Sequence, residues 1–570
     1  MGPPKGEACS GGLCLFLTMG VPIITLAGRG LFSRIVARAN FRGAFAMPAR
    51  LSLLLAAGAI AGAADFTQPP RIAPNPNPQA PLAAVLRFAA SEPVETVITV
   101  SGGGAPHQLR YGMDRKPQEG LPVLGMRAGR RHLIEVAIRD ARGRVTKAPA
   151  ALEYTPPPLP PGMPPIRVSA PLKERMEPGF TIISVRTLSP TLGLLVAIDA
   201  EGEIVWLYRT GSRISDFERR RNGNVLLCTL DFEILEIDML GNTVARWYAR
   251  GRPKGAGEGI AVDTMTFHHE IDELPNGNLL ALGTSVREIA DYYTSETDAG
   301  APRKAQRVMG DQVVEFTRAG KVVWKWDAFD HLDPFRIGYE TFSGYWERRG
   351  FPGVVDWSHA NNLLYDERDD SILISFRYQS AIVKVDHKTG RVVWILGKPE
   401  GWAGRFQDRL FRAVGNTRWF HHQHAPFPTP GGTMLVFDNG NYQASPFEPP
   451  LPPSKTYSRA VEYRLEEKKR TARQIWESES GPGPDSVVSV AMGNAEKMPR
   501  TGNILVSYGA LLDRPGDKWE SGAGRWTRIR EYTHTHPPRL VWEAVIRGAD
   551  PSGKEAWQSF CSTRWPSLAP

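Results

Sequence analysis

Three histidines, His269, His359 and His424, occupy the same point of a phrase that recurs along the chain. The phrase runs from a short strand through a turn into an apolar strand, and its copies with histidine read HEIDELPNGNLL, HANNLLYDERDDSILISFR and HAPFPTPGGTML. Two further copies carry Ser215 and Asn494 at that point. Because equivalent positions of a repeat face a common place, we expect the three histidines to converge. Packing alone gives no reason for histidine there, so the pattern favours chemistry.

Converging imidazoles could bind a metal such as Zn, Cu or Fe, or could act as a nucleophile or an acid–base group. Arg377 ends the apolar strand of the His359 copy. A fixed cation weakens binding of a dication but meets sulfate or phosphate oxygens with two parallel hydrogen bonds. No Asp or Glu stands at the equivalent inward position. The pattern therefore favours an anionic substrate, while a purely imidazole metal site stays open.

The elements that must position these residues are β-hairpins that recur about six times. Each hairpin reads as an apolar strand, a turn with glycine or charge, and a second strand ending near tryptophan: Trp206, Trp247, Trp324, Trp394, Trp476 and Trp542. Repeats of this length are typical of a β-propeller, and a solenoid is the rival architecture. We predict an all-β chain whose residues 170–570 form a six-bladed β-propeller. We expect insertions at 285–310 and 440–456, and the C-terminal SFCSTRW as a closing strand.

The chain before residue 170 divides by composition. Residues 1–64 contain MPARLSLLLAAGAIAGAAD, which is typical of a secretory signal and favours Met47 as the start of translation. A membrane anchor at 13–28 is the alternative, although that apolar run is short for a span. We predict Pro-rich linkers at 65–81 and 156–169. Between them, residues 82–155 alternate apolar and polar positions, which predicts a small β-sandwich.

The net charge of +9 is compatible with an anionic substrate, but no Lys/Arg-dense run interleaves with aromatic residues. We therefore expect no nucleic-acid partner. Only Cys228 and Cys561 lie outside the predicted signal segment, and the sequence leaves open a disulfide or two free thiols. No segment after residue 64 is apolar enough to span a bilayer, so we expect no stable membrane span.

The repeat region also resembles a known family, the bacterial arylsulfate sulfotransferases. The resemblance covers roughly 170–570 and is carried by FHHEIDELPNGNLLALG, GDQVVEFTRAGKVVWKWDAFDHLDP, DWSHANNLLYDERDDSILISFRYQSAIVKVDHKTGRVVWILG, QHAPFPTPGGTMLVFDNGN and YSRAVEYRLEEKKRTARQIWE. It implies a six-bladed propeller, usually periplasmic, that moves a sulfuryl group from an aryl sulfate ester to a phenol. It also implies transfer through a sulfated histidine without a nucleotide sulfate donor.

Carried over by motif, the resemblance makes His424 the nucleophile. It gives His359 and Asn361 contacts to the sulfuryl or phenolic oxygens, and it gives Arg377 the binding and neutralisation of the sulfuryl group. His269 would be an acid–base partner or an oxygen ligand. Family members can carry a disulfide near the active site, and no cysteine pair stands near His424 here.

The sequence thus predicts an exported, periplasmic aryl-sulfate sulfotransferase without metal or other cofactor. Its partners would be a small-molecule aryl sulfate donor and a phenol acceptor, and the resemblance suggests a homodimer. The alternative is a metal-dependent propeller hydrolase or lactonase with the three histidines as ligands. A third hypothesis, a non-enzymatic scaffold, fits the histidine pattern least.

Overall fold

The computed structural model describes residues 63–570 except 188–190, 513–518, 520–524 and 549–555, so the predicted signal at 1–64 lies almost wholly outside the described residues. The described chain is built from β-strands. Its helices are one-turn pieces: α1 (Ala328–His331), η1 (Lys173–Arg175), η2 (Glu347–Arg349), η3 (Gly404–Phe406), η4 (Pro453–Lys455) and η5 (Glu467–Lys469). The all-β prediction is confirmed.

Two antiparallel sheets form the N-terminal part. One has the order β1 (Phe66–Pro74), β2 (Ala84–Ala90), β5 (Leu121–Val123). The other has the order β4 (His107–Tyr111), β3 (Glu95–Ser101), β6 (His132–Arg139), β7 (Val145–Lys147), with β8 (Leu152–Tyr154) also paired to β6. Strand β6 alternates buried and outward-facing residues, as expected where one face of a sheet covers a core.

Both predicted linkers contain strands, and this corrects the sequence reading. Strand β1 lies in the first predicted linker, at 65–81, and pairs with β2. Strand β9 (Ile166–Ser169) ends the second, at 156–169, and pairs with β35. Each lies at the edge of its sheet. An edge strand tolerates proline because one of its sides donates no ladder hydrogen bonds, so proline content alone did not exclude these strands.

Six further sheets follow, which we number in chain order. The first has the order β12 (Ile204–Thr210), β11 (Leu192–Ile198), β10 (Phe180–Thr187), β36 (Gln558–Trp565). The second has β13 (Ile214–Arg219), β14 (Val225–Thr229), β15 (Glu233–Ile237), β16 (Thr243–Ala249), β17 (Ile260–Val262). The third has β18 (His268–Glu273), β19 (Leu279–Tyr292), β20 (Lys304–Phe316), β21 (Val322–Asp327), with β22 (Val354–Asp356) paired to β20.

The remaining three sheets follow the same order of strands. The fourth has β23 (Ala360–Asp366), β24 (Ser371–Phe376), β25 (Ala381–Asp386), β26 (Val392–Gly397). The fifth has β28 (His424–Pro428), β29 (Thr433–Asp438), β30 (Arg459–Glu466), β31 (Thr471–Glu477), β27 (Arg412–Ala413). The sixth has β32 (Asn494–Lys497), β33 (Ile504–Leu512), β34 (Arg525–Tyr532), β35 (Leu540–Ile546), β9.

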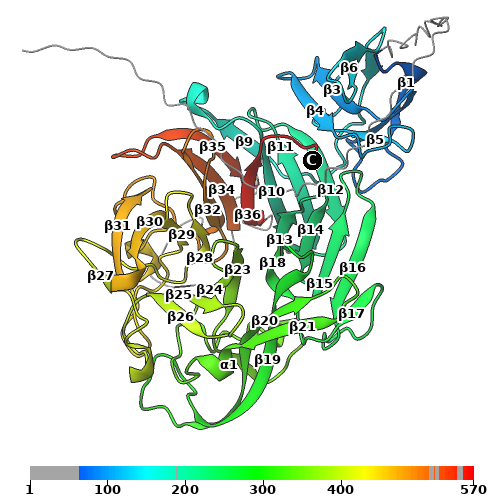
Figure 1. Cartoon of the computed structure of the whole chain (residues 1–570). Helices are drawn as coiled ribbons and strands as arrows, with labels where there is room; N and C mark the ends of the chain where they lie inside the picture. Colours follow the sequence, from blue (N-terminus) through cyan, green and yellow to red (C-terminus); the bar gives the residue numbers. More distant parts are fainter. Residues whose placement is uncertain (1–62, 188–190, 513–518, 520–524, 549–555) are drawn as a thin grey trace, which may run out of the picture. The chain divides into compact units, whose positions relative to one another are not determined.

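The innermost strands of the six sheets contact one another in a closed series, β13, β18, β23, β28, β32 and β36, with β36 returning to β13. Figure 1 shows these strands around a common centre. The C-terminal strand β36 pairs antiparallel with β10, so the last strand of the chain completes the first sheet. The expected closing strand is therefore confirmed.

Apolar layers fill the spaces between successive sheets. Leu226, Trp247 and Phe316 belong to the layer between the second and third sheets. Ile374 and Trp326 belong to the layer between the third and fourth. Such layers bury both faces of the middle strands of the sheets, such as β11 and β24, which therefore read as near-continuous apolar runs.

Tryptophan indoles link neighbouring sheets. An indole N–H of one sheet donates to a carbonyl in an outer turn of the next sheet in five cases: Trp206 to Met239, Trp247 to Arg318, Trp326 to Gly390, Trp476 to Thr535 and Trp542 to Ala200. In the third sheet Trp326 makes this link and is buried, whereas the predicted Trp324 is half-buried against His387. The two side chains lie on the same face of β21, two residues apart, so the repeat pattern predicted Trp324 where Trp326 makes the link.

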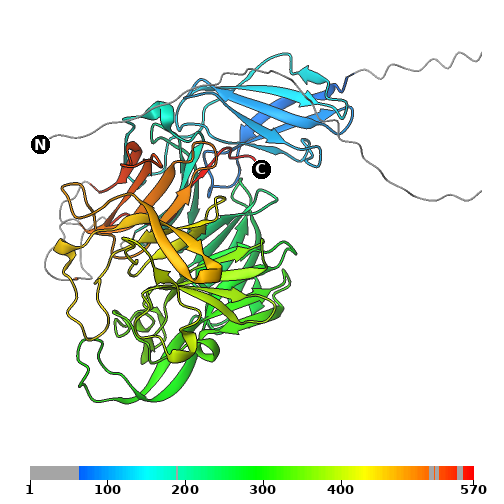
Figure 2. The ribbon, with the colours of Figure 1, turned by 60° about the vertical axis from the view of Figure 1, so that its left-hand side comes forward.

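The expected insertion at 285–310 is a long extension of the hairpin β19–β20, the green ribbon at the bottom of Figures 1 and 2. The one at 440–456 joins β29 to β30. Cys228 and Cys561 are free thiols, which resolves the alternative left open by the sequence.

Candidate functional site

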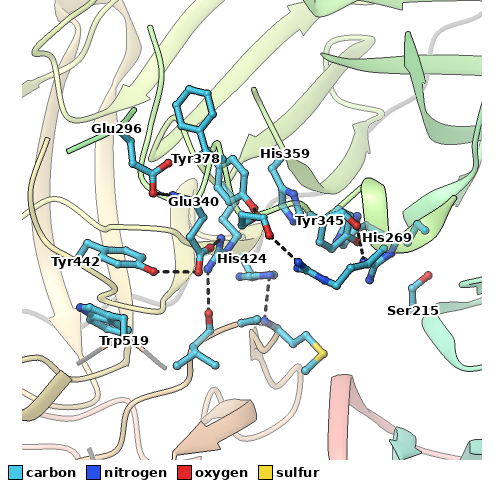
Figure 3. A pocket seen from close by; sticks show the side chains of 18 of the residues that line it. Ser215, His269, Glu296, Glu340, Tyr345, His359, Tyr378, His424, Tyr442 and Trp519 are labelled. Atoms are coloured by element: carbon cyan, nitrogen blue, oxygen red, sulfur yellow. Dashed lines mark hydrogen bonds and ion pairs between the residues drawn. The ribbon is translucent and has the colours of Figure 1, made fainter. Parts of the chain in front are cut away.

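A cavity of about 870 Å³ is lined by His269, His359, His424 and Arg377, four residues singled out in the sequence. Ser215, the residue at the equivalent point of the second sheet, lines it as well. Figure 3 shows the labelled histidines facing the same space from different strands. The structure thus brings together the residues that the repeat placed at one position.

The start of each inner strand is irregular at the histidine. The pairing register shifts between His268 and Ile271 on β18, between Ala360 and Asn362 on β23, and between His424 and Phe427 on β28. Such bulges re-aim side chains at the ends of strands. His269 and His359 also adopt positive φ, 56° and 49°. Non-glycine residues rarely adopt this conformation, and it recurs here at two equivalent positions.

The tautomer of His424 follows from its neighbours. The amide of Asn439 donates to the carbonyls of Ser489 (3.0 Å) and Met492 (3.1 Å), so its oxygen faces His424 Nδ1 at 2.7 Å. Nδ1 therefore carries the proton, and Nε2 keeps its lone pair. The backbone N–H of Met492 donates to that Nε2 over 3.1 Å.

The other two histidines are held in the same way by different partners. His268 Nε2 donates to the carbonyl of Gly283 (3.0 Å), so its Nδ1 accepts from His269 Nδ1 at 2.8 Å. His359 Nδ1 lies 2.5 Å from a carboxylate oxygen of Asp356 and donates to it when Asp356 is ionised. All three site histidines thus use Nδ1 as the anchored donor and leave Nε2 available to the cavity.

Burial and a neighbouring cation keep these imidazoles neutral. Desolvation, followed by the charge of Arg377, holds the pKa of His424 well below its ordinary value, and the same two causes lower the pKa of His359. Burial raises the pKa of Asp356 to about 7. A buried, neutral imidazole with an unprotonated Nε2 has the form required of a nucleophile or a base.

Arg377 directly follows β24 and is 3% exposed. Its guanidinium forms an ion pair with Glu340 and donates to the carbonyl of Val490 (2.9 Å), while its Nε has no partner among the described residues. Glu340 also accepts from the hydroxyl of Tyr442 at 3.2 Å. Arg377, which the sequence analysis expected to bind the sulfuryl group of the substrate, is therefore already paired with the carboxylate of Glu340.

Asn361 does not line this cavity. Its amide donates to the carbonyl of Gln423 (2.7 Å), and it lines a second cavity of about 500 Å³ that also contacts His424 and Phe560. Its side-chain oxygen has no partner among the described residues.

Aromatic rings cover much of the cavity wall. Tyr378 stacks on the His359 ring at 4.5 Å between centroids, and Tyr345 meets that ring edge-on at 4.5 Å. Tyr442 packs against Trp519 at 4.6 Å. These rings suit an aryl group, since offset and edge-on ring pairs are favourable. Within the described ranges, no three His, Cys, Asp or Glu side chains are arranged to hold a metal ion.

Sequence reasoning missed several of these partners. Asp356 stands three residues before His359 within the same quoted run, so the spacing could have suggested it. Glu340 and Tyr345 belong to the connection between β21 and β22, which has no counterpart in the other sheets and gave no repeat signal. Tyr442, in the connection between β29 and β30, also lines the cavity.

Residues 166–548 match the family described as Arylsulfotransferase (ASST). The arylsulfate sulfotransferase AssT of Escherichia coli O6:H1 strain CFT073 is 29% identical over 251 residues, which cover 37% of this chain and 40% of that protein. The AssT of Lelliottia amnigena is 28% identical over 250 residues, covering 36% and 41%. The aligned part is thus less than half the length of these relatives.

Among solved structures, BamB from Moraxella catarrhalis is similar over 73% of this chain and 92% of its own, with 12% identity and a TM-score of 0.24, too low to carry an argument. In the part of the chain that the structure describes, no helix has the length and apolarity needed to cross a bilayer. The family match extends over more than half of the chain and includes the three site histidines, Arg377 and Asn361. The chain belongs to the arylsulfotransferase family.

Proposed function

We propose that this protein transfers a sulfuryl group from a phenolic sulfate ester to a phenol through a sulfohistidine intermediate on His424. One observation carries the proposal: Asn439 holds the Nδ1 proton of His424, which leaves a neutral Nε2 in a cavity that also holds the guanidinium of Arg377. Family membership supplies the aryl sulfate chemistry.

In the donor half-reaction, His424 Nε2 attacks sulfur, the N–S bond forms and the bond from sulfur to the aryl oxygen breaks. The attacking lone pair must first leave its hydrogen bond with the Met492 N–H. Arg377 and His269 face the charge on the sulfuryl oxygens, and Asn361 approaches His424 from the second cavity. Arg377 must share its ion pair with Glu340 when this second anion binds.

His359 is the group that moves the proton in this proposal. Asp356 anchors its Nδ1 and its Nε2 is unprotonated, so the aryl oxygen of the donor leaves as a phenolate. In the second half-reaction Nε2 takes the proton of the acceptor phenol and passes it to the released phenolate or to water. The deprotonated acceptor then attacks sulfur, the N–S bond breaks and neutral His424 returns. His269, which the sequence also offered for this role, is anchored by neutral His268, and the nearby carboxylate of Asp311 contacts only the far nitrogen of His268, at 3.3 Å.

We also propose an architecture, an export route and an oligomeric state for the protein. The six sheets would be the blades of a six-bladed β-propeller at 170–570, and the two N-terminal sheets a β-sandwich at about 82–155. Residues 1–64 would direct export to the periplasm, and the protein would work as a homodimer without metal or cofactor.

The test is a two-substrate kinetic study of the purified protein with 4-nitrophenyl sulfate and phenol. We expect phenyl sulfate as a product, parallel lines in double-reciprocal plots as for a ping-pong mechanism, and unchanged rates in EDTA. Release of 4-nitrophenol without sulfated acceptor, abolished by EDTA, would instead establish a metal-dependent hydrolase.

A further inference from the structure

One wall of the large cavity carries arginines without carboxylate partners. Arg186 on β10 and Arg349 on η2 line the cavity, and Arg213 lies close behind them. Burial, together with the positive charges of Arg213 and Arg349, lowers the pKa of Arg186 to about 9. Among the residues that the structure describes, none of the three forms an ion pair with Asp or Glu.

The contacts of Arg186 are weak for a buried cation. Its Nη2 donates to the thioether sulfur of Met492 at 2.7 Å, and its Nε has no partner within the described part of the chain. Thioether sulfur is a poor acceptor. A desolvated guanidinium without an anion is unfavourable, so such an arrangement indicates a site that an anion completes.

Arg349 is held in place but not neutralised. Its guanidinium lies 3.5 Å from the centre of the Tyr345 ring and donates to the Tyr345 carbonyl at 3.2 Å. The Tyr345 ring in turn packs against His359. The second arginine is therefore positioned through a ring that also touches the proposed acid–base residue.

Met492 contacts both Arg186 and the proposed nucleophile His424. Its backbone N–H donates to His424 Nε2, and its side-chain sulfur accepts from Arg186. The guanidinium and the attacking nitrogen therefore contact the same residue, and both line one cavity.

The carboxylates of the cavity lie on its other side. In Figure 3, Glu296 and Glu340 are at the left with Tyr442, while Ser215 and Tyr345 are at the right. Glu340 is the ion-pair partner of Arg377, so the cation proposed to bind the sulfuryl group is already compensated. The basic wall has charge available for a second anion.

We propose that Arg186 and Arg349 form a subsite for a carboxylate or sulfate carried on the aryl ring of the donor and of the acceptor. The preferred substrates would then be phenols and aryl sulfates with a second anionic group. This inference rests on the proposed function for its turnover readout, whereas its binding readout is independent of turnover.

Binding is measured first, by calorimetry with 4-hydroxybenzoate and its uncharged methyl ester. We expect the wild-type protein to prefer the carboxylate, and Arg186→Gln and Arg349→Gln each to weaken carboxylate binding about tenfold or more while changing ester binding less than about twofold, since hydrogen bonds to charged groups are the strong ones. Arg209→Gln removes an exposed arginine from strand β12 of the same sheet and serves as the control.

Equal losses for acid and ester would show that these arginines act elsewhere than on a second anion, and equal affinities in the wild type would exclude the subsite without any variant. Turnover of the sulfate esters of the same two phenols then separates the two proposals. If neither sulfate is turned over, the proposed function fails while the binding result stands. If both are turned over and the variants lower kcat/KM equally, the subsite fails and the function stands.

Discussion

At the scale of single residues, the site depends on which nitrogen of each histidine is anchored. Asn439, Asp356 and His268 hold the Nδ1 atoms of His424, His359 and His269, so three different partners produce the same presentation of Nε2. The histidines were predictable because they share a point in a repeat. The partner of His424 was not, because Asn439 lies fifteen residues beyond it, on the following strand connection. Asp356 and His268 stand three residues and one residue before their own histidines, and this proximity was a readable signal.

The first prediction concerns the proton-transferring pair. Asp356 has a pKa of about 7, so it is ionised above that pH and supports His359 as a base only there. The rate at which phenol discharges the sulfated enzyme should therefore rise with pH through about 7. In Asp356→Asn the rise should disappear and the rate at pH 8 should fall on the order of 10²-fold.

Single-turnover quench measurements with phenol would follow this rate, and Asp366→Asn, a buried carboxylate on β23 outside the cavity, is the control. An unchanged pH profile in Asp356→Asn would remove Asp356 from the proton transfer.

A second prediction concerns the nucleophile. The pKa of His424 lies well below 6.5 because of burial and Arg377, so the imidazole stays neutral as the pH falls through 6.5. The burst of 4-nitrophenol in the donor half-reaction should change less than about twofold between pH 7.5 and 6. An unperturbed histidine would lose about three quarters of its neutral form at pH 6. A burst rate with a midpoint near 6.5 would contradict the proposed environment of His424.

At the scale of elements, the repeated hairpins were readable because turn residues and tryptophans recur at similar spacing. The edge strands β1 and β9 were not, because their prolines are typical of linkers and edge strands alike. The third sheet shows the limit of the pattern, since two tryptophans share one face of β21 and only Trp326 reaches the next sheet.

The structure therefore predicts unequal effects of two alanine substitutions. Trp326 is 2% exposed, stacks on His331 at 4.9 Å and donates to Gly390, so Trp326→Ala should lower the free energy of unfolding by about 3–5 kcal/mol. Trp324→Ala, at the half-buried neighbour, should lower it by about 1 kcal/mol. Urea denaturation compares the two variants. A larger loss for Trp324→Ala would mean that the repeat pattern, and not the observed link, identifies the structural tryptophan.

At the scale of the whole molecule, an innermost strand from the C-terminus closes the series of six sheets. Strand β36 pairs with β10 and contacts both β13 and β32, so a C-terminal segment completes a sheet formed almost four hundred residues earlier. The sequence predicted this strand from its composition and position. It could not predict that β9, from before the repeats, would extend the sixth sheet, because the pairing of an edge strand leaves no periodic signal.

Two proline substitutions compare how much β36 and β9 contribute to the stability of the protein. Ser562 lies within β36 opposite Ile183, and its N–H donates to Asn494 of the sixth sheet. Ser562→Pro should destabilise the protein by about 1–3 kcal/mol, because the ring removes the donor that joins β36 to the sixth sheet and leaves the Asn494 oxygen without it. Arg167→Pro, in the outer edge strand β9, should have a much smaller effect. Thermal unfolding followed by circular dichroism measures both, and equal shifts in Tm would argue against closure through β36.

The most direct test of the account is the mass of the intact protein after incubation with 4-nitrophenyl sulfate and no acceptor. We predict a gain of about 80 Da, one sulfuryl group, that maps to His424, disappears on addition of phenol and is absent in His424→Ala. The matched variant His422→Ala, two residues away, should still take up the group. If the wild-type protein turns over the donor and passes its sulfuryl group to phenol without ever gaining this mass, His424 is not a covalent carrier and the central claim is wrong.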